Sequence, residues 1–151
     1  MTRILMVCLG NICRSPLAEG ILKSKLPEQS FVVDSAGTGD YHIGGLPDHR
    51  SIAIARQNNI DITNQRARQF SRSDFDAFDH IYVMDQSNFQ NVINLARDTV
   101  DKSKVKLIMD MLDSAISDVP DPYFGGENGF VTVFEMLDQA CEKIASTLLN
   151  D

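Results

Sequence analysis

The side chains best suited to chemistry lie near the start of the chain, in the segment CLGNICRS at residues 8–15. An apolar run leads into Cys8, Cys13 follows, and Arg14 and Ser15 close the segment. Three interpretations compete: a metal or redox pair, a nucleophile in an anion-binding loop, or two buried cysteines that serve packing alone. The metal interpretation is the weakest, because Cys8 and Cys13 lack the C-x2-C spacing and no histidine or second cysteine pair supports a zinc site.

The anion-binding interpretation follows from what such a loop does physically. If Cys8 ends a strand and a helix begins near Ser15, loop N–H groups can point inward and the helix N-terminus adds partial positive charge. Gly10 permits a positive φ, and Asn11 tolerates the left-handed region. The planar fork of Arg14 suits a tetrahedral oxyanion. A thiol there is expected to be ionised and to accept from Ser15, which predicts a nucleophile inside a phosphate site.

The elements that would position this loop can be predicted from the pattern of apolar residues. Short apolar runs rich in β-branched residues predict strands at residues 4–7, 31–34, 80–84 and 105–109. Helical patterns predict helices over residues 15–27, 47–58, 87–97 and 130–148. The last helix carries one continuous apolar stripe, which indicates that it packs against the rest of the fold.

Strands that alternate with helices predict βαβ units, and right-handed crossovers then give a parallel sheet. The predicted fold is therefore α/β: a single doubly wound domain over residues 1–151, with a four-stranded parallel sheet flanked by helices on both faces. In such a sheet, ligands bind beyond the carboxyl ends of the strands at the topological switch point. The loop after the first strand is expected to lie there.

The composition excludes several classes of protein. A chain of 151 residues is long enough to bury a core as one domain without a metal or disulfide. The formal net charge of −7 argues against partners such as nucleic acid or an anionic membrane, although one local phosphate site is compatible with it. No apolar stretch approaches the roughly 18 residues of a membrane span, and no signal peptide is recognisable. A cytoplasmic chain with reduced thiols, a monomer or a weakly self-associating one, is expected.

The segment at residues 8–15, with its C-x5-R-S pattern, resembles the low-molecular-weight protein tyrosine phosphatases. The resemblance is carried as well by SPLAE, DSAG, ARQ, VMDQSN and DPYFGG, which begin at residues 15, 34, 67, 83 and 121. It therefore covers nearly the whole chain. It implies a phosphatase that needs neither metal nor cofactor, acts on phosphotyrosine-containing proteins and releases inorganic phosphate.

The resemblance also implies a role for each site residue. Cys8 attacks phosphorus and becomes a phosphocysteine. Asp121 protonates the leaving phenolate and then activates water, a division of labour that one carboxyl group can perform. The phosphate-binding loop consists of Leu9, Gly10, Asn11, Ile12, Cys13, Arg14 and Ser15. Supporting residues are Asn11, Ser15 and Ser35, and contacts to the substrate ring are assigned to Tyr41, Tyr123 and Phe124. Apart from the resemblance, Asp85 is a carboxylate at the end of a predicted strand and is expected to support the site through a hydrogen bond.

Several residues keep a second interpretation. Without the resemblance, Asp118 rivals Asp121 as the acid, since an Asp-Pro pair is ordinarily a turn. Cys13 is able to form a disulfide with Cys8 under oxidant, and the resemblance implies this protective switch. A small buried side chain that packs under the loop is the alternative role for Cys13. Cys141 lies on an apolar helical stripe and is expected to be structural. The three histidines, His42, His49 and His80, do not show the spacing of metal ligands, so they are expected to be solvated or packed.

Gln65 departs from the family pattern, which often has histidine at this position. Glutamine can hydrogen-bond but cannot become a cation, so the contacts behind the loop are expected to differ.

Rival functions fit the residues less well. An arsenate reductase needs two further cysteines, and only Cys141 remains after the loop. A protein arginine phosphatase typically carries Thr in place of Ile12, and Ile12 with Tyr41 favours phosphotyrosine. A phosphocarrier domain has no use for Arg14 and an acid, and a non-catalytic phosphotyrosine-binding module would be expected to lack Cys8 or the acid.

Overall fold

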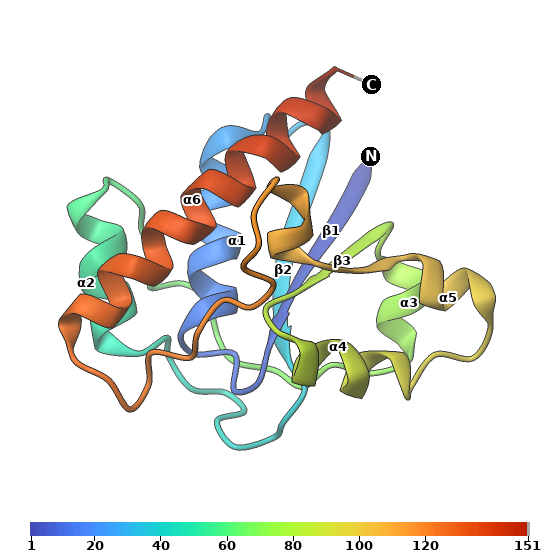
Figure 1. Ribbon diagram of the computed structural model, residues 1–151, viewed down its shortest axis with the longest axis horizontal. Helices are drawn as coiled ribbons and strands as arrows, with labels where there is room; N and C mark the ends of the chain where they lie inside the picture. Colours follow the sequence, from blue (N-terminus) through green and yellow to red (C-terminus); the bar gives the residue numbers. More distant parts are fainter. Residues whose placement is uncertain (151) are drawn as a thin grey trace.

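Four parallel strands form the centre of the molecule, and a computed structural model describes residues 1–150 of the chain. The strands are β1 (Thr2–Cys8), β2 (Phe31–Gly37), β3 (His80–Val83) and β4 (Val105–Leu107). They pair in the order β2-β1-β3-β4 (Figure 1). The chain leaves β1 for β2 on one side and later enters β3 on the other, so the switch point lies between β1 and β3. The predicted four-stranded parallel sheet is confirmed.

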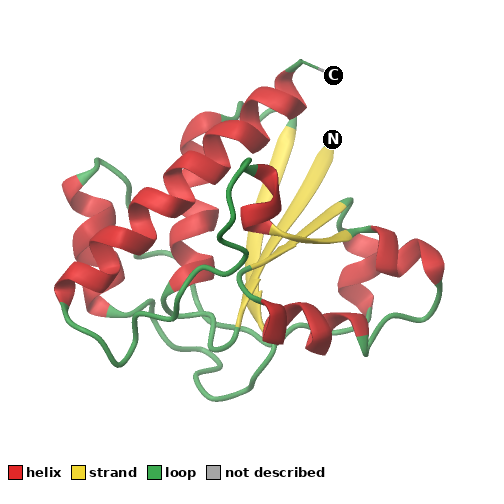
Figure 2. Cartoon of the chain, in the orientation of Figure 1, coloured by secondary structure: helices red, strands yellow, loops and turns green. Residues whose placement is uncertain are grey.

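Helices cover both faces of this sheet (Figure 2). Alternate residues of β1 point to opposite sides: Ile4 and Met6 join one buried cluster, and Leu5 and Val7 join the other. The first cluster also contains residues of α1 (Arg14–Lys25), α2 (His49–Gln57) and α6 (Glu127–Leu149). The second contains residues of α3 (Ser73–Ala77) and α4 (Gln86–Ile93), and α5 (Thr99–Ser103) packs beside β4. The predicted two-sided covering is confirmed.

The C-terminal helix α6 follows the predicted apolar stripe. Its residues Phe130, Leu137 and Cys141 are buried, and the helix packs along α1. The first strand begins and α6 ends at the same end of the sheet, whereas the carboxyl ends of the strands lie at the opposite end (Figure 1). Within residues 1–150, no helix combines the length and the apolar character needed to cross a membrane.

Some predicted boundaries were wrong. The fourth strand stops at Leu107 instead of continuing to residue 109, because residues 108–111 form a short 3₁₀ helix, η1 (Ile108–Met111). Helix α4 starts earlier than predicted, because the Asp85 carboxylate accepts from Asn88 N–H and caps it, and it also ends earlier, at Ile93. Helices α3 and α5 were missed, because five residues are too few to show a helical period.

Candidate active site

Cys8 is the last residue of β1, at the switch point of the sheet, and it pairs with Gly37 of β2. Its side chain is only 2% exposed and belongs to the cluster on the α1 face. The sulfur accepts a hydrogen bond from the backbone N–H of Asn11 at 3.3 Å and lies 3.0 Å from the hydroxyl oxygen of Ser15. Two polar groups therefore face the sulfur from the loop and from the start of α1.

The hydrogen bonds of Asn11 decide which way the Ser15 hydroxyl points. The side-chain oxygen of Asn11 accepts from Arg68 N–H at 3.0 Å, so its Nδ2 must face the serines. That Nδ2 donates to Ser15 Oγ at 2.7 Å and to Ser35 Oγ at 2.9 Å. Because an amide NH₂ group only donates, the Ser15 oxygen accepts there, and its own hydrogen remains for the Cys8 sulfur.

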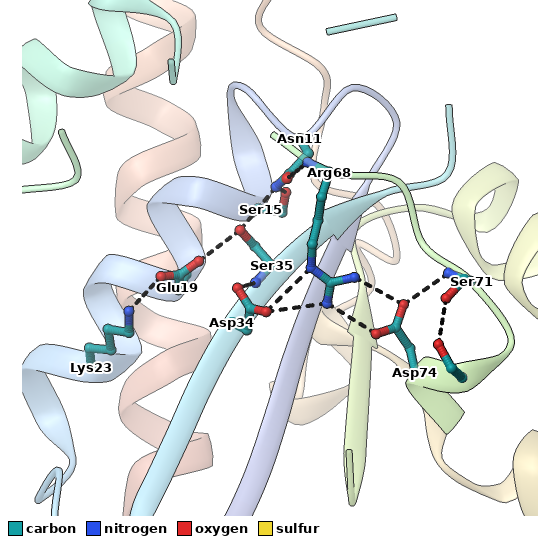
Figure 3. A network of polar contacts seen from close by, with 10 residues as sticks. Asn11, Ser15, Glu19, Lys23, Asp34, Ser35, Arg68, Ser71 and Asp74 are labelled. Atoms are coloured by element: carbon teal, nitrogen blue, oxygen red, sulfur yellow. Dashed lines mark hydrogen bonds and ion pairs between the residues drawn. The ribbon is translucent and has the colours of Figure 1, made fainter. Parts of the chain in front are cut away.

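The left-handed residue of the loop is Asn11, with φ of 56°. The sequence allowed a positive φ at Gly10 and at Asn11, and the structure uses it at Asn11; among the glycines of residues 1–150, only Gly44 has one. The three side-chain hydrogen bonds of Asn11 hold the strained conformation in place (Figure 3). Gly10 instead leaves room for a neighbour, since a Cβ there would lie 3.2 Å from Cδ2 of His42.

The network continues away from the loop along α1 (Figure 3). Ser35 donates to the Glu19 carboxylate at 2.8 Å, and Lys23 donates to the other oxygen of Glu19 at 2.6 Å. Burial raises the pKa of Glu19, and the neighbouring Lys23 and Ser35 only partly offset this. Gln65 does not enter this chain; it donates to Pro16 O at 3.1 Å. The cationic partner of Glu19 is therefore Lys23.

The loop presents unsatisfied donors toward a ligand. Within residues 1–150, the backbone N–H groups of Leu9, Gly10, Ile12 and Cys13 have no hydrogen-bond acceptor. They precede the N-terminus of α1, where the helix dipole adds partial positive charge. A ring of free N–H groups beside a helix N-terminus binds tetrahedral anions.

Arg14 stands beside these groups, 2% exposed. Its Nη1 donates to Asp85 at 2.7 Å and to the carbonyl of Val119 at 2.9 Å, and its Nη2 lies 3.7 Å from Asp121 Oδ2. Burial opposes its charge, but the nearby Cys8 and Asp85 outweigh burial and raise the pKa of Arg14. Within residues 1–150 its Nε and Nη2 have no hydrogen-bond acceptor, so the edge of the guanidinium that carries these two nitrogens is available for an oxyanion. Asp85 thus orients the guanidinium.

A pocket of about 320 Å³ opens above the loop. Its lining residues are Cys8, Leu9, Gly10, Ile12, Cys13, Arg14, Tyr41, His42, Asp121, Tyr123 and Phe124. The rings of Tyr123 and Phe124 pack edge to face with their centroids 4.9 Å apart, and the ring centroids of His42 and Tyr123 are 6.2 Å apart. The structure therefore brings the predicted ring contacts to one pocket. His42, which was expected to be solvated or packed, packs in the pocket wall, a location that the sequence did not indicate.

The structure separates the two candidate acids. Asp121 lines the pocket with a side chain that is 41% exposed, and its Oδ1 accepts from Tyr123 N–H at 3.1 Å. Asp118 instead accepts from Gln86 N–H at 3.0 Å, which ties it to the start of α4, and it does not line the pocket. The geometry favours Asp121 as the group that could exchange a proton with a ligand.

The three cysteines occupy different environments. Burial raises the pKa of Cys13 to about 12, and the negative charges of Asp48 and Cys8 add to the effect, so Cys13 is a neutral thiol at pH 7. Cys141 lies in the core, and its sulfur contacts the carbonyl of Ala18 at 3.7 Å. All three thiols are free. The Cys8–Cys13 disulfide stays a prediction.

Glu19 and Lys23 were also missed. A signal existed for them, because residues 15, 19 and 23 are spaced at i, i+4 and i+8 and must share one face of a helix. Arg50, which hydrogen-bonds to carbonyls near Asp121, had no such signal, since the contact joins residues 75 positions apart.

The chain matches the family model described as low molecular weight phosphotyrosine protein phosphatase over residues 3–151. It is 40% identical to a putative low molecular weight protein-tyrosine-phosphatase of Synechocystis sp., over 97% of this chain and 96% of that protein.

Solved structures agree. A protein tyrosine phosphatase of Entamoeba histolytica, with Hepes in its active site, is 34% identical and superposes with a TM-score of 0.92 over 99% of this chain and 98% of that one. Wzb of Vibrio vulnificus, in complex with benzylphosphonate, is 29% identical with a TM-score of 0.87 over 97% of this chain and 98% of that one. The chain therefore belongs to the low molecular weight phosphotyrosine protein phosphatase family.

Proposed function

We propose that this protein hydrolyses phosphotyrosine in proteins through a phosphocysteine on Cys8, with Asp121 as general acid and then general base. The observation that carries the proposal is the pocket itself. A buried sulfur that accepts from Asn11 and faces the Ser15 hydroxyl lies in the same pocket as Asp121 and a buried arginine fork. Nucleophile, oxyanion donors and acid are the three components that phosphoryl transfer through a covalent intermediate requires.

In the first step, the Cys8 sulfur attacks phosphorus and the bond from phosphorus to the phenolic oxygen breaks. Asp121 gives its proton to that oxygen, so tyrosine leaves as a neutral phenol. The loop N–H groups and Arg14 hold the three remaining oxygens as the transition state forms.

In the second step, water attacks phosphorus from the side that the phenol has left, and Asp121, now a carboxylate, accepts the proton of the water. The bond from sulfur to phosphorus breaks, and inorganic phosphate and the Cys8 thiolate are the products. The Ser15 hydroxyl and Asn11 N–H stabilise the departing thiolate, since hydrogen bonds to the charged form favour it.

Aromatic side chains support a phenolic substrate. Tyr41, Tyr123 and Phe124 border a pocket whose volume of about 320 Å³ lies at the small end of the range for ligand sites. The related Wzb structure that holds benzylphosphonate supports an aromatic ring above a phosphate-like group. Ile12, also in the lining, favours phosphotyrosine over phosphoarginine, and the buried Cys141 does not suit the thiol relay of an arsenate reductase. The cytoplasmic location and the monomeric or weakly associating state stay predictions.

The test compares phosphate release from three matched peptides that carry phosphotyrosine, phosphoserine or phosphoarginine. We expect the phosphotyrosine peptide to be hydrolysed with the highest kcat/KM, and Cys8→Ser to abolish turnover of all three. Undiminished activity of Cys8→Ser would overturn the mechanism, and a preference for phosphoarginine would overturn the substrate assignment.

A further inference from the structure

Asp121 lies in a loop, residues 119–126, that we call the acid loop, and an arginine holds each end of it. At the upstream end, Val119 N–H donates to the carbonyl of Met84 at 2.8 Å. The carbonyl of Val119 accepts from Arg14 at 2.9 Å. This end is therefore fixed both to Met84, the residue directly after β3, and to Arg14 of the phosphate site.

At the downstream end, Arg50 makes the corresponding contacts. Its Nη2 donates to the carbonyl of Tyr123 at 2.9 Å, and its Nη1 donates to the carbonyl of Gly125 at 3.1 Å. The rest of this end has little anchoring, because Phe124 is 94% exposed. A loop with so little buried apolar surface depends on its few hydrogen bonds for a fixed position.

Arg50 is itself held in one orientation. Asp48 accepts from its Nε and its Nη2, both at 3.0 Å, in the bidentate arrangement that a planar guanidinium favours. The guanidinium carbon also lies 4.5 Å from the ring centroid of Phe130. Burial of Asp48 works against its charge, but Arg50 outweighs burial and lowers the pKa of Asp48. The pair is therefore ionised at neutral pH.

The same pair reaches the phosphate-binding loop. The backbone N–H of Asp48 donates to the carbonyl of Ile12 at 2.8 Å. On the other side, Tyr123, whose carbonyl Arg50 holds, gives its own N–H to the carboxylate of Asp121. A short series of hydrogen bonds thus runs from Ile12 through Asp48, Arg50 and Tyr123 to Asp121.

We propose that Arg50 is a positioning residue for Asp121: it fixes the acid loop to the phosphate-binding loop and so sets the place of the acid relative to the Cys8 sulfur. This inference rests on the proposed function, in which Asp121 protonates the leaving group. Arg50 does not line the pocket, so it acts through the loop and not on the substrate.

The first experiment uses leaving groups of different basicity. In Arg50→Ala, kcat/KM for phenyl phosphate is expected to fall about 10- to 100-fold, because a small misplacement of a catalytic group has effects of this size. The value for p-nitrophenyl phosphate, whose leaving group needs little protonation, should fall less than about threefold. The matched control is Arg56→Ala, an exposed arginine at the other end of α2, which should change neither value. Equal losses on both substrates would overturn the proposal.

A second variant guards against loss of folding. Arg50→Lys keeps an aliphatic stem over Phe130, but a single ammonium group cannot reproduce the planar fork. It should show the same selective loss on phenyl phosphate with an unchanged Tm. The double variant Arg50→Ala with Asp121→Ala should lose less than about twofold beyond Asp121→Ala alone, because residues that act as a unit are not additive. A full additional loss in the double variant would show that Arg50 does not act through Asp121.

A third measurement does not depend on activity. The chain has no tryptophan, so Tyr123→Trp places a single fluorescent reporter on the acid loop. Adding Arg50→Ala should raise acrylamide quenching of this tryptophan at least about twofold, whereas adding Arg56→Ala should not. Unchanged quenching would overturn the positioning role even if the wild-type protein hydrolyses aryl phosphates. Raised quenching in a protein without such activity would retain the contact and reject the proposed function.

Discussion

At the scale of single residues, the two cysteines of one loop differ in their chemistry. Cys8 accepts from Asn11 N–H and faces the Ser15 hydroxyl, in the pocket that Arg14 also lines. Cys13, with a pKa raised to about 12 by burial and nearby negative charge, remains a thiol. Cys8 is the proposed nucleophile, and the more nucleophilic of two sulfurs is also the more easily oxidised one.

This difference predicts the order of events under peroxide. Cys8 should be oxidised first to a sulfenic acid, with reduction of peroxide to water. The Cys13 thiol should then attack that sulfur, form a disulfide and release a second water. Inactivation of the wild-type protein should be fully reversed by dithiothreitol, as measured by activity and peptide mapping.

The control is Cys141→Ser, which should behave as wild type because Cys141 lies in the core. Cys13→Ser should instead be inactivated irreversibly. Peptide maps of oxidised wild type that contain only the sulfonic acid of Cys8 would contradict the disulfide.

At the scale of elements, β2 and the phosphate-binding loop approach each other closely. A Cβ on Gly37, at the end of β2, would lie 2.8 Å from the carbonyl oxygen of Leu9. Gly37→Ala must therefore displace backbone, and it should lower the free energy of unfolding by about 1–3 kcal/mol and weaken phosphate binding.

For Gly129, the same substitution by alanine is expected to have the opposite effect on the free energy of unfolding. It lies in α6, and a Cβ there meets only ordinary contacts of 3.6 Å and 4.0 Å with Pro122. Gly129→Ala should raise the free energy of unfolding by about 0.5–1 kcal/mol, since alanine is the better helix residue. Urea unfolding measures both, and a destabilised Gly129→Ala alongside a neutral Gly37→Ala would contradict this account.

Helix α1 carries Ser15, Glu19 and Lys23 on one face, so the helix links the thiol loop to a surface cation. The pKa of Glu19 is raised by burial above its ordinary value of 4.5. Its stabilising contribution is therefore complete below about pH 4.5 and is lost as the pH rises through the folded-state pKa. Lys23 lowers that pKa and limits the loss.

Lys23→Ala should consequently lower the free energy of unfolding at pH 7 by about 1 kcal/mol, a value discounted because Lys23 is half-exposed. Near pH 4 it should have little effect, because Glu19 is then protonated in both proteins. Lys143→Ala, an exposed lysine on α6, is the control and should be neutral at both pH values. An equal loss at pH 4 and pH 7 would assign the effect to packing of the Lys23 stem.

At the scale of the whole molecule, occupation of one small site should change the stability of the entire fold. The proposed phosphate-binding loop has its shape only in the folded chain, so inorganic phosphate at 100 times its Kd should stabilise the protein by about 2.7 kcal/mol. For a domain of this size the Tm should rise by about 5 to 10 °C.

Potassium chloride at the same ionic strength should leave the Tm unchanged. Arg14→Lys should show less than about half of the phosphate-induced shift, because an ammonium is not a planar fork. A full shift in Arg14→Lys would indicate that phosphate binds elsewhere.

Local patterns in the sequence predicted the sheet, its two-sided covering and the loop that holds Cys8 and Arg14. The place of Asp121 beside that loop came from the family resemblance, because residues alone left Asp118 as an equal rival. The sequence did not predict Arg50 or His42, whose contacts depend on how distant loops meet. It allowed a positive φ at either Gly10 or Asn11, and the side-chain hydrogen bonds that select Asn11 come from segments distant in the sequence.

The placement of the chain ends has a practical consequence. The first strand begins and α6 ends far from the carboxyl ends of the strands, where the pocket opens (Figure 1). A fluorescent protein fused at either end, or a bead coupled through an affinity tag, would leave the pocket facing the bulk solution. The enzyme can therefore be displayed on a surface and screened against arrays of phosphopeptides while its pocket stays accessible.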